Sequence, residues 1–162
     1  LIIRGSGLRS RGLELFQRRW MEEMFRLALT GEREKVPALL ERYRAAFGNH
    51  EFDIEMFMKT ETLQESLEGY REKVRQKKRN PAAAYALALR AERPYQPGDQ
   101  ISYYVTGRGR KVKVHEHGKL AAEWDPAHPD ENVEYYIGKL EELYAKFLPF
   151  LEGGGPEAGE EA

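Results

Sequence analysis

Apolar residues recur every three or four positions along much of the chain, and this spacing is typical of amphipathic helices. Trp20, Met24 and Leu27 follow it and predict a helix over residues 18–29. By the same criterion we expect four more helices, over residues 32–47, 62–70, 81–91 and 132–151. Thr62 and Glu65 fit a capping box at the start of the third of these five helices.

Alternation of apolar and polar residues predicts one strand over Gln100–Thr106. A glycine-rich turn follows, and Lys111–His115 is expected to pair back as the second strand of a hairpin. We also expect a short extended segment over residues 13–16 and a strand or half-turn over residues 54–58. The pattern indicates a mainly helical α+β chain with a small β-hairpin.

The length and composition are those of one domain with its own core. A chain of 162 residues can bury enough apolar surface to fold without staples. It has no cysteine, which excludes disulfides and cysteine-ligated zinc. No apolar run approaches the roughly 18 residues of a membrane helix. We therefore expect a soluble cytoplasmic chain with no membrane partner. Because it does not begin with Met, we expect a piece of a longer protein.

Charge is strongly segregated along the chain, although the formal net charge is only −1. Arg71–Arg79 holds six cations and one acid, and Arg108–Lys113 holds four cations and no acid. From Leu120 onward there are eleven acids and two lysines. Local patches set the field that a polyanion meets, so the near-neutral total does not exclude a nucleic-acid partner.

Four segments, in a fixed order, match motifs of one enzyme family. They are Gly12–Trp20, Leu67–Arg71 with Pro81, Pro97–Tyr103, and Glu123–Pro126 with Glu134–Ile137. In this order and at these separations they resemble the end of the palm and the thumb domain of family B DNA polymerases. The resemblance covers most of the chain, from Gly12 to Leu151. It departs from the family pattern at Arg19, Glu65, Ala82 and Asn132, which replace other residue types.

The resemblance implies a palm-like end at residues 1–18 and a thumb-like DNA-binding domain at residues 19–151. The composition of residues 152–162 predicts a disordered acidic tail. The implied activity of the parent protein is DNA-directed addition of deoxynucleotides to a primer with two Mg²⁺ ions. The implied partners are a double-stranded primer–template and the catalytic palm, in the nucleoid.

Two-metal phosphoryl transfer requires paired carboxylates that hold both ions. No such pair can be assigned within residues 1–151, so the catalytic aspartates are expected upstream of Leu1. We assign no catalytic residue, no metal ligand and no cofactor to this chain, and we leave open whether the chain itself is an enzyme.

The candidate DNA contacts are the cations of the basic run and two residues before it. They are Lys59, Tyr70, Arg71, Lys73, Arg75, Lys77, Lys78 and Arg79. Such cations neutralise phosphates and carry little sequence information. The alternative is a solvated helix end whose cations are favoured by the helix dipole. Lys59 with Thr60 and Thr62 suits a phosphate at a helix start, or only a cap. Tyr70 either bonds the DNA backbone or packs beside Leu67.

Other groups favour structural interpretations. His115 and His117 would face one side of the predicted hairpin strand while Glu116 faces the other, which is a poor metal site. The hairpin cations suit a solvated turn. Neither Ser66 nor Ser102 has an evident histidine partner for nucleophilic catalysis.

Two further functions stay open at this stage. One is a free-standing, non-catalytic DNA-binding or scaffold protein derived from a polymerase thumb. The other is a helical protein-interaction module that binds no DNA.

Overall fold

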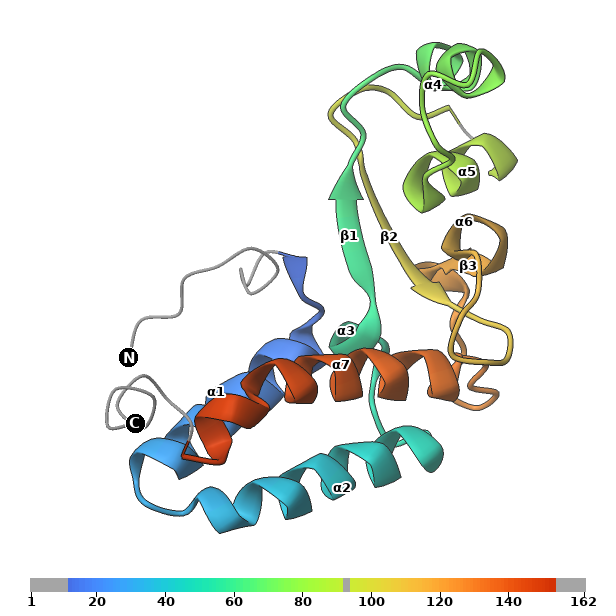
Figure 1. The fold of residues 1–162 in the computed structure, drawn as a ribbon. Coiled ribbons are helices and arrows are strands. Elements are labelled where there is room, and N and C mark those ends of the chain that lie inside the picture. Colours follow the sequence, from blue (N-terminus) through green and yellow to red (C-terminus); the bar gives the residue numbers. More distant parts are fainter. Residues whose placement is uncertain (1–11, 92–93, 154–162) are drawn as a thin grey trace. The chain divides into compact units, whose positions relative to one another are not determined.

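The computed structural model describes residues 12–91 and 94–153 of the chain. These residues form two compact units, whose elements are drawn in Figure 1. The helical unit contains residues 12–52 and 136–153, and the mixed unit contains Asp53–Tyr135. The chain therefore passes through the mixed unit once and returns to the helical unit in its last helix.

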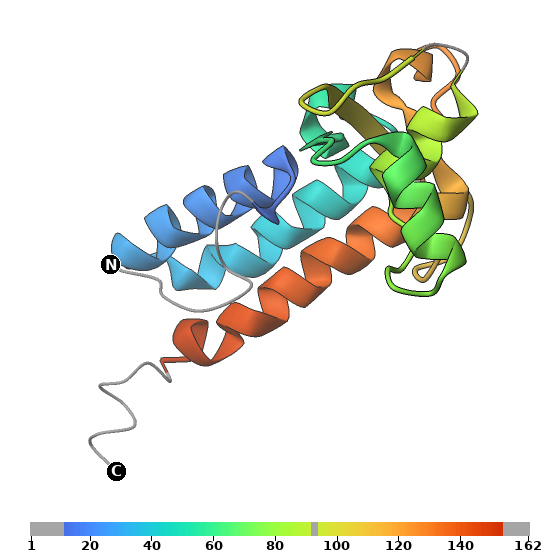
Figure 2. The ribbon, with the colours of Figure 1, turned by 90° about the horizontal axis from the view of Figure 1, so that it is seen from above.

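Three helices build the helical unit. They are α1 (Leu15–Leu29), α2 (Val36–Gly48) and α7 (Val133–Leu151), the last from Tyr136 onward. Within this unit the three helices lie side by side (Figures 1 and 2). A short 3₁₀ helix, η2 (Arg33–Lys35), leads into α2.

Aromatic rings fill the space between these helices. Phe47 is fully buried, and its ring centroid lies 4.9 Å from that of Phe16 and 5.6 Å from that of Tyr136. The ring centroid of Phe52 lies 4.8 Å from that of Phe47. Because each buried aromatic side chain removes roughly 150–250 Å² from water, this cluster is a main source of the unit's stability.

A buried ion pair links the start of α1 to α7. Glu14 is buried, and its two carboxylate oxygens accept from Lys139 Nζ at 2.7 and 3.0 Å. Glu14 also forms a capping box with Gln17, whose Oε1 accepts from the Glu14 amide at 3.0 Å. The cap starts α1 at Leu15. The extended segment predicted over residues 13–16 is therefore wrong at its last two residues.

The mixed unit contains a three-stranded antiparallel sheet. Its strands are β1 (Lys59–Thr62), β2 (Gln100–Val105) and β3 (Gly118–Leu120), in the order β1-β2-β3. In the middle strand, Tyr103 pairs with the first residue of β1 and the last residue of β3. β2 is thus the strand on which the other two are assembled.

Short helices surround this sheet. They are α3 (Ile54–Phe57), α4 (Leu67–Arg75), α5 (Ala83–Arg90), α6 (Val114–His117) and the 3₁₀ helix η3 (Ala121–Glu123). Figure 1 shows α4 beyond one end of the ribbon formed by β1 and β2, α6 with β3 near its other end, and α5 between α4 and α6. For residues 54–58 a strand or a half-turn was expected, and the structure has the one-turn helix α3 there.

Helix α5 lies at the centre of the main hydrophobic cluster of the mixed unit. Its alanines allow close approach, and Ala84 and Ala88 are each 1% exposed. The larger buried members of the cluster are Leu63, Tyr70, Tyr85, Leu87, Tyr95, Ile101 and Tyr103. The cluster therefore joins α4 and α5 to the sheet.

The predicted hairpin is wrong. β2 does not pair with Lys111–His115, because its partners are β1 and β3. The Thr106 amide and hydroxyl both donate to His117 O, at 2.9 and 2.7 Å, so the intervening residues form a loop and a helical turn. His115 and His117 lie in α6 and not on a strand, so the argument from a shared strand face is wrong as well.

Helix α4 begins later than predicted. Thr62 belongs to β1 and pairs with Gln100 of β2, which holds it extended. The N-cap is Ser66, whose Oγ accepts from the Gly69 amide at 3.0 Å. The capping box predicted at Thr62 and Glu65 is therefore wrong.

The mainly helical α+β class is confirmed. The helices predicted over residues 18–29 and 132–151 are confirmed as α1 and α7. Most of the acidic tail predicted at residues 152–162 lies outside the described residues, which end at Gly153.

Candidate DNA-binding surface

Helix α4 presents an apolar face and a basic face. Leu67, Tyr70 and Val74 pack in the hydrophobic cluster, and Tyr70 is only 4% exposed. Helical spacing then directs the polar residues of the segment outward. The exposed cations of α4 and the turn after it, called here the α4 surface, are Arg71, Lys73, Arg75, Lys77 and Lys78.

The helix ends in a Schellman motif that places a lysine in an unfavourable backbone conformation. The Lys78 amide donates to Lys73 O at 2.8 Å, and the Lys77 amide donates to Val74 O at 3.0 Å. Lys77 has a φ of 60°, in the left-handed region that favours glycine. The equivalent position after α1 is Gly31, with a φ of 80°. A side chain costs about 1 kcal/mol in this conformation, so α4 keeps a cation where glycine would be more stable.

Acidic neighbours neutralise three cations of the basic run. The Glu65 carboxylate lies 3.2 Å from Lys73 Nζ and 3.1 Å from Arg79 Nη1. Arg75 pairs with Glu72 at 2.6 Å, and its hydrogen bond is the main cause that lowers the pKa of the Glu72 carboxyl. These three cations already have a partner within the mixed unit.

The other three cations have no such partner. Within the described ranges, the side chains of Arg71, Lys77 and Lys78 form no ion pair and no hydrogen bond. All three are exposed. The α4 surface therefore offers three uncompensated positive charges to an external ligand.

Arg79 packs against two tyrosines of the hydrophobic cluster next to the α4 surface. Its guanidinium lies 4.5 Å from the ring centroid of Tyr85 and 5.1 Å from that of Tyr70. These two rings stack on each other with centroids 4.6 Å apart. A guanidinium over aromatic faces is held by cation–π attraction, and Glu65 holds the same group from the side.

The tyrosine hydroxyls fix the backbone on both sides of α4. Tyr70 Oη accepts from the Ala82 amide at 3.0 Å, and Tyr85 Oη accepts from the Gln64 amide at 2.7 Å. These bonds anchor the segments that lead into and out of the basic run. A DNA contact by Tyr70 stays a prediction, and its hydroxyl already has this structural partner.

Lys59 lies apart from the α4 surface. It is the first residue of β1, whereas α4 follows the last residue of that strand (Figure 1). The Thr60 and Ser102 hydroxyls, which face each other across β1 and β2, share a hydrogen bond of 2.6 Å. Lys59, Thr60 and Thr62 lie in β1, and the next helix, α4, starts only at Leu67. These three residues therefore do not form the helix start at which a phosphate site was expected.

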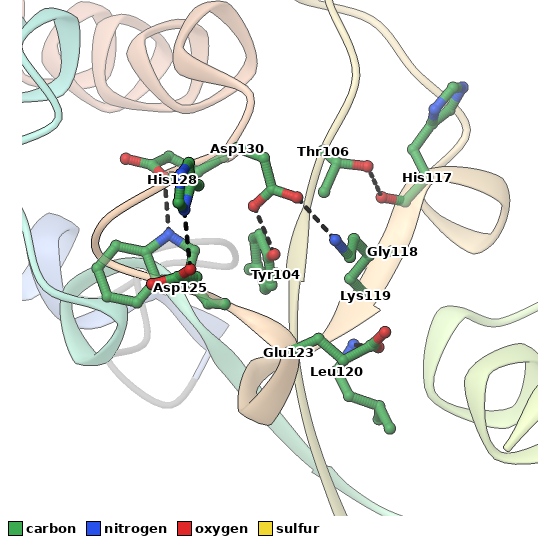
Figure 3. Close-up of polar contacts among 12 residues, drawn as sticks. Tyr104, Thr106, His117, Gly118, Lys119, Leu120, Glu123, Asp125, His128 and Asp130 are labelled. Atoms are coloured by element: carbon green, nitrogen blue, oxygen red, sulfur yellow. Dashed lines mark hydrogen bonds and ion pairs between the residues drawn. The ribbon is translucent and has the colours of Figure 1, made fainter. Parts of the chain in front are cut away.

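A polar network around Asp130 was not predicted from the sequence. Tyr104 is fully buried and donates to Asp130 Oδ1 at 2.6 Å, while Lys119 Nζ donates to Asp130 Oδ2 at 2.8 Å (Figure 3). Burial and then the bond to Asp130 raise the pKa of the Tyr104 hydroxyl. Burial alone would raise the pKa of Asp130, but the bonds from Lys119 and Tyr104 lower it below its usual value. This network ties β2 and β3 to the segment before α7.

A cavity of about 560 Å³ lies beside α5 and β3. The charged side chains that line it already have hydrogen-bond or ion-pair partners. Arg90 donates to two backbone carbonyls, Lys119 pairs with Asp130, and Glu123 accepts from the Leu120 amide. The cavity therefore offers no unpaired charge comparable to that of the α4 surface.

Neither a metal cluster nor a membrane helix is found in the described part of the chain. Across residues 12–91 and 94–153, His, Asp and Glu do not gather in groups of three or more that could hold a metal ion. No helix of the same ranges is long and apolar enough to cross a membrane.

Comparison with known proteins gives one kind of match. No family model and no curated protein sequence matches the chain. Among solved structures, the family B DNA polymerase from the hyperthermophilic archaeon Pyrobaculum calidifontis is similar, with a TM-score of 0.64 and 22% sequence identity. The match covers 83% of this chain but only 17% of that polymerase. At this identity the likeness is one of fold, and the fold resemblance to a family B DNA polymerase that the motifs predicted is confirmed.

Proposed function

We propose that this chain grips double-stranded primer–template DNA as the thumb part of a family B DNA polymerase. The α4 surface contacts the phosphates, and Arg71, Lys77 and Lys78 supply most of the attraction. Such contacts hold the duplex in register and are independent of base sequence. In the cell this activity belongs to the nucleoid.

The single observation that carries the proposal is the set of three exposed cations without a partner, one on α4 and two in the turn that follows it. Charges already paired would have to give up a carboxylate before they could bind a phosphate. Arg71, Lys77 and Lys78 would not. The tyrosine and arginine contacts behind α4 also fix its backbone in advance, which reduces the ordering cost of binding.

In this proposal the chemistry belongs to a catalytic partner. Addition of deoxynucleotides with two Mg²⁺ ions would be carried out by a palm that supplies the carboxylates, and this chain would hold the duplex beside it. No catalytic step is assigned to this chain in the proposal.

One observation favours a second candidate, a non-catalytic DNA-binding or scaffold protein derived from a thumb. Glu65 stands where the family pattern has a basic residue, and its carboxylate neutralises both Lys73 and Arg79. An acid at this position weakens the attraction for a polyanion. A scaffold that binds a protein partner would tolerate this change better than a processive polymerase would.

The test is duplex binding by the whole chain over a series of salt concentrations. On B-form DNA each neutralised phosphate contributes about −0.9 to the slope of log affinity against log salt. The proposal predicts that changing Arg71, Lys77 and Lys78 to Ala reduces the magnitude of this slope by about 2.7. At about 0.1 M salt, affinity should fall by roughly several hundredfold.

A matched control removes the same charge elsewhere. Arg19, Arg26 and Lys146 are exposed residues of the helical unit, and their triple Ala variant also lowers the net charge by three. It should keep most of the slope. Equal loss in both variants would mean that only net charge matters, and no duplex binding by the unaltered chain would reject the proposal in favour of a protein-interaction module.

A further inference from the structure

A second group of uncompensated cations lies in the loop after β2. Residues 107–113, called here the basic loop, contain four cations and no acid. Arg108, Lys111 and Lys113 are exposed, and their side chains form no ion pair or hydrogen bond with any residue in the described ranges. The basic loop thus carries the same kind of free charge as the α4 surface.

Hydrogen bonds hold the first part of this loop, at Thr106 and Gly109. Asn132, which is 1% exposed, donates from Nδ2 to Gly109 O at 3.0 Å and to Thr106 O at 3.3 Å. The Gly109 amide donates to Glu134 Oε1 at 2.9 Å. A buried side chain therefore uses its donors to tether the first part of an exposed basic loop.

Glycine makes that conformation accessible. Gly107 and Gly109 have φ values of 89° and 96°, in the left-handed region. A Cβ at Gly107 would lie only 2.9 Å from His117 Nδ1, so no side chain fits there without movement. Close to the base of the loop, Thr106 donates twice to His117 O (Figure 3).

The basic loop and the α4 surface lie at opposite ends of one strand. Gln100 at the start of β2 pairs with Thr62, the last residue of β1 before the segment that leads to α4. Val105 ends β2, and the basic loop follows it (Figure 1). Six strand residues span about 20 Å. This length corresponds to roughly six base pairs of a duplex at about 3.4 Å each.

We propose that the basic loop is a second phosphate-binding site for nucleic acid, formed by Arg108, Lys111 and Lys113. This inference rests on the proposed function, because it assigns the loop to the same duplex that the α4 surface holds. The loop contacts backbone phosphates beyond the reach of α4. The hydrogen bonds at Gly109 lower the ordering cost that an untethered loop would carry.

The experiment uses the full chain and a 20-base-pair duplex, with affinity measured by fluorescence anisotropy over a salt series. Changing Arg108, Lys111 and Lys113 to Ala should reduce the magnitude of the log–log slope by up to about 2.7. Combination with the triple α4 variant should give an additive reduction. A variant with Arg108→Lys, Lys111→Arg and Lys113→Arg keeps the charges and should keep the slope.

The two proposals fail in different ways. If the loop variant keeps the slope of the unaltered chain while the α4 variant loses its share, the loop inference is wrong and the proposed function stands. If the α4 variant and the loop variant both keep the full slope, both proposals are wrong. Loss of slope in the charge-retaining variant would also overturn the loop inference, because it would show a structural role.

Discussion

The two units of this chain use the same charged residue types in different ways. In the helical unit, Lys139 is bound to the buried Glu14 at 2.7 Å, and Arg44 pairs with Glu141. In the mixed unit, three cations of the α4 segment have no partner among the described residues. Paired charges position helices, whereas unpaired exposed charges add little to folding.

From this difference we expect stability and DNA affinity to depend on different regions of the molecule. The helical unit is held by its aromatic cluster and a buried ion pair, and the α4 surface rests on stacked tyrosines that keep its backbone in place. Substitutions in the first region should therefore change the free energy of unfolding. Substitutions on the α4 surface should change affinity for DNA.

The largest expected effect is on stability, for Phe47→Ala. Phe47 is fully buried among Phe16, Phe52 and Tyr136, so truncation leaves a cavity. We expect a loss of about 3–5 kcal/mol in the free energy of unfolding, measured by chemical denaturation. Well below the transition, the salt slope of duplex binding should be unchanged. A loss under about 1 kcal/mol would mean that the ring cluster is not the core of the unit.

A smaller effect is expected for Glu65→Gln, which should increase affinity for the duplex. This change frees Lys73 and Arg79 from their shared carboxylate and should tighten duplex binding roughly threefold to tenfold at about 0.1 M salt. Glu68→Gln is the matched control, because it removes one negative charge from the exposed first turn of α4 without breaking an ion pair there. Equal gains in the two variants would show that local pairing does not limit the grip.

Lys77→Gly should separate stability from affinity at one residue. Glycine relieves the positive φ and should raise the free energy of unfolding by about 0.5–1 kcal/mol, while one phosphate contact is lost. His50 occupies the same position after α2, with a φ of 53°. His50→Gly should leave affinity for the duplex unchanged, because it removes no phosphate contact. Tighter duplex binding by Lys77→Gly would contradict a contact by this lysine.

The smallest expected effect concerns pH and Asp130→Asn. The pKa of Asp130 is lowered in the folded state, so its charge contributes stability above about pH 4 that is lost as the pH falls through the folded value. The pKa of Lys119 is raised, so its contribution is present below about pH 10 and is lost as the pH rises through the folded value. The free energy of unfolding of Asp130→Asn should be about 0.2–1 kcal/mol lower than that of the unaltered chain at neutral pH. It should also fall less as the pH is lowered. If denaturation gives the same free energy of unfolding against acidic pH for the variant and the unaltered chain, Asp130 does not contribute to stability through its charge.

The long periodic elements of the fold could be predicted from the sequence. Helices α1 and α7 have apolar residues at helical spacing over many turns, and Asn132 caps α7 by accepting from the Tyr135 amide at 3.0 Å. The strand β2 was predicted from its alternation. Its partners were not, because β1 lies far away in the sequence and three-residue β3 has too little pattern to recognise.

The candidate site was only partly predictable. A run of cations is visible in the sequence, but pairing depends on the fold. Glu65 reaches Lys73 and Arg79 because α4 starts at Leu67 and not at Thr62. The stacking of Arg79 on two tyrosines and the clamp of Asn132 on the basic loop are likewise tertiary contacts with no signature in local sequence.

The most direct test of the α4 grip is lysine footprinting on the full chain. An amine-reactive ester is applied with and without saturating 20-base-pair duplex, and modification of each lysine is followed by mass spectrometry. The account predicts that the duplex slows modification of Lys77 and Lys78, while Lys146 in the helical unit reacts at an unchanged rate. Equal rates at Lys77 and Lys78 with and without bound duplex would contradict it.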